Sequence, residues 1–203
     1  MLTIVFAETA LEFFKGRVLD ANDDWKVLSR YENKDKRGRP DIAHDLLKLS
    51  LDSGLNKRGE LRVFVHTYDE RVISVSPELR LPRSYKRFVG LMEDLEHKGN
   101  IEADDKTLLK IEQKTLKQLL TELKTDFIVM DATGKKTKLK ALVSLLSKNK
   151  DAGIILGGFP HGLFLDKSKA LAGLPRIAIG ETELTAPAVL SAVLTCAEMA
   201  REA

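Results

Sequence analysis

The sequence predicts an α/β protein with a mostly parallel sheet and helices on both faces. Short apolar runs rich in β-branched residues recur at 2–7, 127–130, 152–156 and 177–179. A helix is predicted between the second and third runs and another after the fourth, and the last two runs lead into turns that contain glycine. Continuous apolar strands that alternate with helices are typical of a parallel sheet covered on both faces.

The first third of the chain provides the opening elements. Residues 2–7 predict a buried strand. Residues 42–49 have apolar side chains at helical spacing, and Asp41 stands at the position of an N-cap. Residues 61–67 and 72–75 alternate with the period of a strand, so we expect them to pair as a hairpin.

The remaining elements alternate between the two types. Residues 85–98 carry Phe88, Leu91, Met92 and Leu95 on one stripe, which predicts an amphipathic helix. Further strands are predicted at 108–111, 127–130, 152–156 and 177–179, and further helices at 114–124, 139–146 and 186–199.

The last predicted helix has almost no polar face. Residues 188–197 are small and apolar on nearly every face, and such a helix is buried on more than one side. In a chain of this size, one face covers the sheet and we expect a partner subunit to cover the other. Burial beneath a long loop of the same chain is the alternative.

Composition describes an ordinary globular protein. The chain has 203 residues, 43% hydrophobic and 31% charged, enough for one good core. Cys196 is the only cysteine, which excludes a disulfide framework and a cysteine-based zinc site, and we expect no metal. The start lacks a basic leader and the run 184–197 is too short to span a bilayer, so we expect a soluble, cytoplasmic protein.

Two basic segments stand out in a chain whose formal net charge is only +3. Residues 80–87 contain four cations and no acid, with Arg80, Arg83 and Arg87 spaced to share one face of a helix. Arginine is the side chain that grips phosphate with two hydrogen bonds. A solvated basic face is the alternative reading of this segment.

The second basic segment, 34–41, is predicted as a loop because it contains Gly38 and Pro40. Together the two segments indicate one surface that follows phosphates, with Arg37 and Arg39 contributed by this loop. Asp41 is expected to cap the next helix or to orient an arginine. We rank both above an acid–base role, since neighbouring arginines weaken a carboxylate as a base.

Glycine-rich turns follow two of the predicted strands, and ligands bind beyond the carboxyl ends of strands in such sheets. Residues 157–162 read Gly-Gly-Phe-Pro-His-Gly, which lets main-chain groups approach a nucleoside-like cofactor closely. The turn 180–187 is positioned to close the same pocket. A simple strand-exit turn is the alternative, and neither a phosphate-binding P-loop nor a dinucleotide fingerprint is present.

The order of these motifs resembles one family. Arg37-Gly-Arg-Pro-Asp41, Arg80-Leu-Pro-Arg83 with Lys86-Arg87-Phe88, and the loop 157–162 occur as in ribosome-biogenesis methyltransferases of archaeal type, which methylate ring nitrogen 1 of a pseudouridine in small-subunit ribosomal RNA. That family belongs to the SPOUT, or α/β-knot, superfamily. The resemblance implies S-adenosylmethionine as cofactor, a homodimer, a C-terminal trefoil knot, and one domain over 1–203 with an embedded RNA-binding extension at about 61–106.

The resemblance also implies roles for individual residues. The expected RNA contacts are Arg37, Arg39, Arg80, Arg83 and Arg87, and the expected cofactor-binding residues are Met130, Asp131, Gly157, Gly158, Phe159, Pro160, His161, Gly162, Ile179, Gly180, Glu181, Leu184, Thr185 and Ala186. Asp41, the only acid beside the arginine motif, is the candidate general base. Two alternatives remain: an RNA-binding assembly factor without turnover, and a SPOUT methyltransferase acting on another RNA such as transfer RNA.

Overall fold

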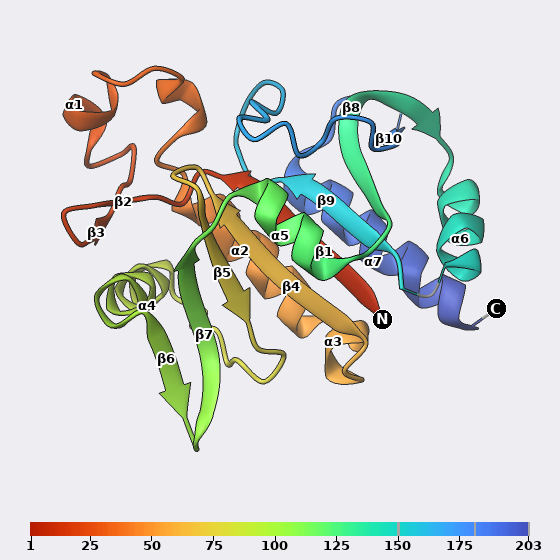
Figure 1. The fold of residues 1–203 in the computed structure, drawn as a ribbon, viewed down its shortest axis with the longest axis horizontal. Helices are drawn as coiled ribbons and strands as arrows, with labels where there is room; N and C mark the ends of the chain where they lie inside the picture. The colour runs from red at the N-terminus through yellow and green to blue at the C-terminus, as the bar shows by residue number, and fades with distance from the viewer. Residues whose placement is uncertain (150, 181, 203) are drawn as a thin grey trace.

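A central sheet organises the computed structural model, which describes residues 1–149, 151–180 and 182–202. In these ranges eight strands form one sheet in the order β10-β8-β9-β1-β4-β5-β7-β6 (Figure 1). The strands are β1 (Leu2–Thr9), β4 (Leu61–Thr67), β5 (Arg71–Val75), β6 (Asn100–Ala103), β7 (Lys106–Gln113), β8 (Phe127–Thr137), β9 (Gly153–Gly157) and β10 (Arg176–Ile179). The run from β10 to β4 is parallel and the run from β4 to β6 is antiparallel, so the predicted α/β class with a mostly parallel sheet is confirmed.

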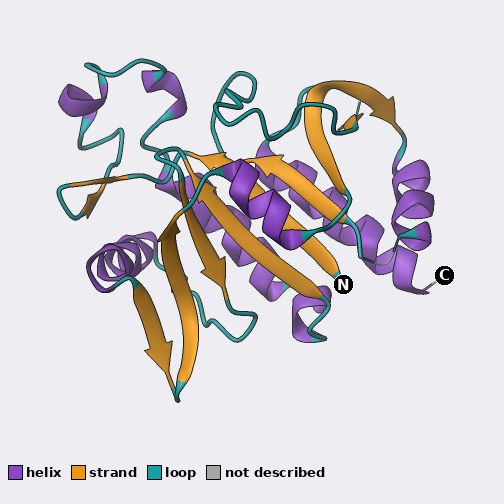
Figure 2. Cartoon of the chain, viewed as in Figure 1, coloured by secondary structure: helices purple, strands orange, loops and turns teal. Residues whose placement is uncertain are grey.

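Helices cover both faces of the sheet (Figure 2). α5 (Leu116–Leu123) packs with Val5 and Ile155 on one face. On the other face lie α2 (Pro40–Asp52), α4 (Tyr85–Lys98), α6 (Leu139–Lys148) and α7 (Ala186–Glu202). The short elements α1 (Trp25–Leu28), η1 (Lys34–Lys36), α3 (Gly54–Lys57) and the ribbon of β2 (Phe13–Phe14) with β3 (Arg17–Val18) complete the chain.

β1 shows why a central strand has apolar residues at consecutive positions, here 4–7. All of its side chains are buried, with Ile4 and Phe6 in the core beneath α2 and α7 and Val5 and Ala7 in the core beneath α5. Successive side chains of a strand point to opposite faces, so a strand covered on both faces needs apolar residues at consecutive positions.

Some of the predicted strands agree with the structure and others differ from it. The hairpin of β4 and β5 is confirmed, with Val63 opposite Val75. β6 was not predicted, and β8 runs seven residues beyond the predicted 127–130, to Thr137. β6 and the second half of β8 are largely exposed and polar, so they lack the apolar alternation that reveals a strand.

Two helix starts also differ from expectation. α2 begins at Pro40 with Arg39 at the N-cap position, so Asp41 lies in the first turn and the prediction that it caps the helix is wrong. Proline suits this position because its missing N–H would be unpaired there. α4 begins at Tyr85, so Arg80 and Arg83 precede the helix and do not share a helical face with Arg87.

The parallel strands bring their carboxyl ends to one edge of the sheet, where the chain leaves β8, β9 and β10 (Figure 1). None of the helices within the described ranges has the length and apolar character needed to cross a membrane.

Candidate active site

A cavity of about 870 Å³ opens where β9 and β10 end and β8 bends, and the first turns of α2 and α7 complete its wall. The loops after β9 and β10 therefore meet in space, as the sequence predicted. The predicted cofactor residues that line it are Met130, Asp131, Gly157, Phe159, Pro160, His161, Gly162, Ile179, Gly180, Leu184, Thr185 and Ala186.

Two predicted cofactor residues are not placed at this cavity. Glu181 lies outside the described residues. Gly158 is buried and is not among the lining residues, and a Cβ built on it would come within 2.5 Å of the Thr9 hydroxyl. Packing against the end of β1 therefore requires glycine at 158, and contact of Gly158 with the cofactor stays a prediction.

Glycines shape the two loops in different ways. Gly180 has φ of +85°, a left-handed conformation that favours glycine, and this turns the chain sharply after β10. A Cβ on Gly157 would lie 2.7 Å from the Phe159 ring, so the absence of a side chain lets that ring fold back over the strand end. Phe159 meets Phe164 edge to face, with 5.2 Å between the ring centroids.

Asp131 anchors the end of the β8 core segment. Its Oδ1 accepts hydrogen bonds from the Thr133 N–H at 2.8 Å and the Thr133 hydroxyl at 2.7 Å, and its Oδ2 pairs with Arg176 of β10. Burial alone would raise the pKa of Asp131, but the Thr133 hydrogen bonds and the Arg176 guanidinium together hold it below its usual value. The carboxylate thus ties β8 to β10 at the floor of the cavity.

Glu8 holds the cofactor loop from beneath, which the sequence analysis did not predict. Its carboxylate accepts hydrogen bonds from the backbone N–H groups of Leu165 at 2.7 Å and Asp166 at 2.5 Å. Its own backbone has φ of +51°, an uncommon conformation for a residue with a side chain. This buried side chain therefore fixes the return path of the loop that begins at Gly157.

Lys36 holds the same loop at a second point. Its amine donates a hydrogen bond to the Leu163 carbonyl and lies 3.6 Å from the centroid of the Phe159 ring. Burial lowers the pKa of Lys36, and the nearby Glu8 carboxylate opposes that effect. Two buried side chains of opposite charge thus hold the segment 163–166.

Arg39 and Asp41 lie at the mouth of the cavity and line it. The two side chains form a paired contact, Nε to Oδ1 at 2.8 Å and Nη2 to Oδ2 at 2.7 Å. The prediction that Asp41 orients an arginine is confirmed. Both side chains are about two-fifths exposed, so the guanidinium keeps donors that are accessible from the cavity and from solvent.

Arg37 has a different environment from its neighbour. Its guanidinium pairs with Glu12 through Nε at 3.0 Å and Nη2 at 2.6 Å, and it lies over the rings of Tyr31 and Tyr68. The side chain is only 13% exposed. Arg37 therefore holds this loop in place through Glu12, and the RNA contact expected of it stays a prediction.

The three downstream arginines are exposed but not equivalent. Arg83 pairs with Asp52 of α2 at 2.6 and 3.1 Å. Arg80 and Arg87 make no ion pair among the described residues. A hydrogen bond of 2.7 Å between the His44 ring nitrogen and the Pro82 carbonyl oxygen holds the loop before α4 against α2.

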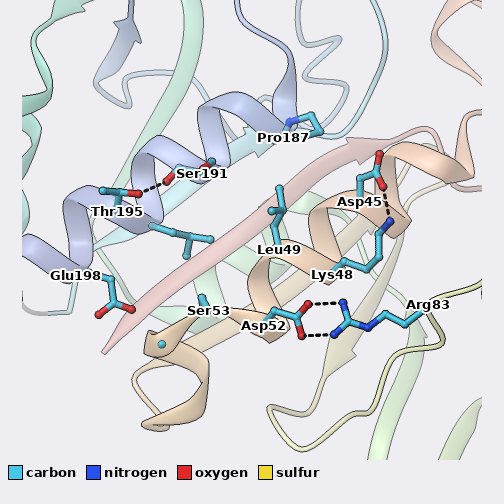
Figure 3. A pocket seen from close by; sticks show the side chains of 12 residues that line it. Asp45, Lys48, Leu49, Asp52, Ser53, Arg83, Pro187, Ser191, Thr195 and Glu198 are labelled. Carbon is cyan, nitrogen blue, oxygen red and sulfur yellow. Dashed lines mark hydrogen bonds and ion pairs between the residues drawn. The ribbon is translucent and has the colours of Figure 1, made fainter.

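A shallow groove of about 600 Å³ runs between α2 and α7 beside the cavity (Figure 3). Leu49 of α2 and Thr195 of α7 lie along it, and the Arg83–Asp52 pair stands at one margin. Asp45 and Pro187 line both the groove and the cavity. α2 therefore connects the cavity, the groove and one of the exposed arginines.

The fold and this cavity place the chain in a class, the SPOUT-fold methyltransferases. A crystal structure of Archaeoglobus fulgidus Nep1 bound to S-adenosylhomocysteine superimposes with a TM-score of 0.87 and 30% sequence identity, covering 99% of each chain. The likeness therefore extends over the whole arrangement of strands and loops described above.

Sequence relatives identify the family within that class. The model of the EMG1/NEP1 methyltransferase family matches residues 4–198. The ribosomal RNA small subunit methyltransferase Nep1 of Pyrococcus furiosus is 44% identical over 151 residues, covering 74% of this chain and 67% of the relative. That of Staphylothermus marinus is 38% identical over 185 residues, covering 89% and 79%. The chain belongs to the EMG1/NEP1 methyltransferase family, so the resemblance expected from the motifs is confirmed.

Proposed function

We propose that this protein uses S-adenosylmethionine to methylate ring nitrogen 1 of a pseudouridine in small-subunit ribosomal RNA, as a step of ribosome biogenesis. The observation that carries the proposal is the shared cavity: the loops after β9 and β10 line it together with Arg39. A donor pocket and a cation suited to phosphate therefore border the same space. The names of the relatives, small-subunit ribosomal RNA methyltransferases, support the substrate class.

The residues around the cavity fit S-adenosylmethionine. Leu156, Phe159, Ile177 and Leu184 offer apolar surface suited to an adenine ring, and the glycine turns expose main-chain groups. Asp45 and Glu183 supply negative charge to a cavity that would hold a cationic sulfonium. The volume lies within the range of about 300–1,000 Å³ typical of small-ligand pockets. The A. fulgidus relative binding S-adenosylhomocysteine supports the same assignment.

Methyl transfer requires the side chains mainly to position the target nucleotide. When bound, the cofactor supplies an electrophilic methyl group. The protein must hold the target ring nitrogen beside that group and keep the two aligned, and such positioning accounts for a large share of the rate enhancement in two-substrate reactions. Arg39 would bind the backbone of the target nucleotide and Asp41 would hold Arg39. Both oxygens of Asp41 already accept from that guanidinium, so a role in orientation fits it better than proton removal.

The exposed arginines extend the RNA surface from the cavity along α2 and α4. Arg80, Arg83 and Arg87 would contact phosphates of the RNA on either side of the target nucleotide. The region at about 61–106, which includes the β4–β5 hairpin and α4, would serve as the RNA-binding extension of the single domain. The fastening of Pro82 to His44 supports this, because it fixes the arginine loop to the helix that also borders the cavity.

A homodimer would use the groove between α2 and α7. α7 exposes Ala188, Ser191 and Thr195 on the side away from the sheet, and Leu49 of α2 is 37% exposed beside them. Small side chains along a groove let a second helix approach closely. Because this groove shares residues with the cavity, a partner seated there would bring its own arginines near the site.

Methylation of short RNA hairpins tests the proposed function. The protein is incubated with S-adenosylmethionine and with two hairpins that differ only in carrying uridine or pseudouridine, and the methyl group is located by mass spectrometry. We expect methylation at ring nitrogen 1 of the pseudouridine hairpin alone, reduced strongly in Arg39→Met. Methylation of uridine at carbon, of a ribose, or of transfer RNA in preference to the hairpin would refute the assignment, and binding without turnover would favour an assembly factor.

A further inference from the structure

A second basic element stands at the cavity, outside the arginine motifs. The stretch 132–140 contains Lys135, Lys136, Lys138 and Lys140, and the sequence has no acid between Asp131 and Asp151. We call these four lysines the lysine ribbon. Nothing in the cofactor chemistry described above requires four cations here, so the ribbon needs another explanation.

The backbone carries the ribbon away from the sheet core. The pairing of β8 with β9 ends at Met130. The register of β8 against β10 shifts between Val129 and Lys135, where the strand bends. A Cβ on Gly134 would lie 2.6 Å from the backbone of Arg176 and Ile177, so this glycine lets β8 cross directly against β10. Figure 1 shows the second half of β8 turning over the end of the sheet towards α6.

The ribbon continues the lining of the cavity outward. Lys136 lines the cavity, and Lys138, two residues further on, has an extended backbone with φ of −70° and ψ of 147°. Side chains two residues apart in extended chain point to the same side, so Lys138 continues the side of Lys136. The backbone N–H of Arg39 donates a hydrogen bond to the carbonyl of Ala10, just past β1, and β9 lies between β1 and β8 in the sheet. The two cationic elements thus approach the cavity from different sides of the β9 loop.

In the part of the chain that the structure describes, three lysines of the ribbon lack the acidic partners that other lysines have. Lys135, Lys138 and Lys140 are exposed, and within the described ranges their amines make no ion pair. Lys106 and Lys110 of β7, by contrast, pair with Glu78 at 2.7 Å and Glu112 at 3.0 Å. Like charges close together, as in these three lysines, repel one another unless an anion lies against them.

We propose that the lysine ribbon is a second phosphate-contact surface, which binds the RNA backbone on the side of the target nucleotide away from the arginine loop. The proposal rests on the function proposed above, because it takes the same RNA as its ligand. The RNA would then cross the cavity, with Arg39 and its neighbours on one flank and the ribbon on the other. Contacts on both flanks fix where along the strand the target nucleotide lies.

The salt dependence of RNA binding tests this surface. The Lys138→Gln/Lys140→Gln protein is compared with wild type and with a matched control, Lys117→Gln/Lys124→Gln, two exposed lysines on and at the end of α5. Binding to the pseudouridine hairpin is measured from about 50 to 200 mM salt. We expect the slope of log affinity against log salt to fall by about 0.7–0.9 for each phosphate that the ribbon variant no longer neutralises, with little change in the control. Affinity for S-adenosylhomocysteine, measured by calorimetry, should be unchanged in both.

The outcomes separate this proposal from the proposed function. If wild type binds and methylates the hairpin but the ribbon variant keeps the wild-type slope, the ribbon proposal fails and the proposed function stands. If the ribbon variant instead changes the molecular mass measured by light scattering, the lysines serve contact between copies of the chain and the proposal is overturned. If wild type binds no hairpin at all, both fail together.

Discussion

Glu8 and Lys36 show how single residues set the shape of the cofactor loop. Burying a charge is costly unless it is paired and hydrogen-bonded. Here both charged groups form hydrogen bonds with backbone groups of the same loop. The Phe159 ring, which lines the cavity, lies beneath the Lys36 amine. Removing either charge should therefore loosen the cavity wall without touching the ligand directly.

Replacing Lys36 by methionine tests this positioning role. We expect Lys36→Met to weaken S-adenosylhomocysteine binding by about tenfold, which corresponds to about 1.4 kcal/mol, because the loop loses its tether at Leu163. Lys34→Met is the matched control, since Lys34 lies two residues away and its amine is 5.3 Å from the Trp25 ring instead of the loop. Calorimetry on both variants decides, and wild-type affinity in Lys36→Met would remove Lys36 from the site.

This residue-scale network could not be predicted from the sequence. Glu8 lies 157 positions from Leu165, and its partners are backbone groups that any residue would provide. A carboxylate directly after a buried strand is a weak signal on its own. The glycines and arginines of the site were predictable, because turns and phosphate contacts restrict residue type strongly.

At the scale of an element, the loop before α2 contains two arginines in different environments. Arg37 is buried against Glu12 and two tyrosine rings, while Arg39 lines the cavity. The sequence shows only that both are arginines beside a glycine and a proline. Which one faces inward depends on the packing of β1 and the segment 19–31 against the loop.

The contrast predicts two separable phenotypes. Arg37→Met should lower the free energy of unfolding by about 3–5 kcal/mol, because it leaves the Glu12 carboxylate buried without its partner. Arg39→Met should keep wild-type stability and weaken RNA binding, since its partner Asp41 is already half exposed. Urea denaturation and hairpin binding of both proteins measure this, and equal loss of stability in the two would contradict the assignment.

Strands were predictable where both faces are buried and not where one face is open. β1 and β9 read as continuous apolar runs and were placed to within two residues. β6 and the second half of β8 are exposed and carry no such pattern. The bend of β8 depends on Gly134 meeting the backbone of β10, a long-range contact that the local sequence does not encode.

At the scale of the whole molecule, the parallel order of strands brings the two glycine turns to one cavity, and this much followed from the sequence. The neighbouring groove between α2 and α7 is the surface proposed above for contact with a second copy of the chain. α7 contributes Pro187, Ser191, Leu194 and Thr195 to its lining, which agrees with the small and apolar surface predicted for the last helix, and charged side chains of α2 and Arg83 line the opposite side.

A substitution in the groove tests the proposed homodimer. Thr195→Glu places a charge on α7 beside Glu198, so we expect the protein to change from a dimer to a monomer of 22.7 kDa. Thr121→Glu on α5 is the matched control, because both threonine hydroxyls donate to the carbonyl four residues earlier in an exposed helix face. Light scattering gives the mass, and an unchanged dimer in Thr195→Glu would show that copies meet elsewhere.

The central claim is that the strand-end cavity and the arginine at its mouth form one site. The most direct measurement is a crystal structure of the protein with S-adenosylhomocysteine and the pseudouridine hairpin bound together. The account predicts the pseudouridine ring inside the cavity, with ring nitrogen 1 facing the cofactor sulfur and a neighbouring phosphate on Arg39. A target nucleotide bound on another surface, with the cavity holding the cofactor alone, would contradict it.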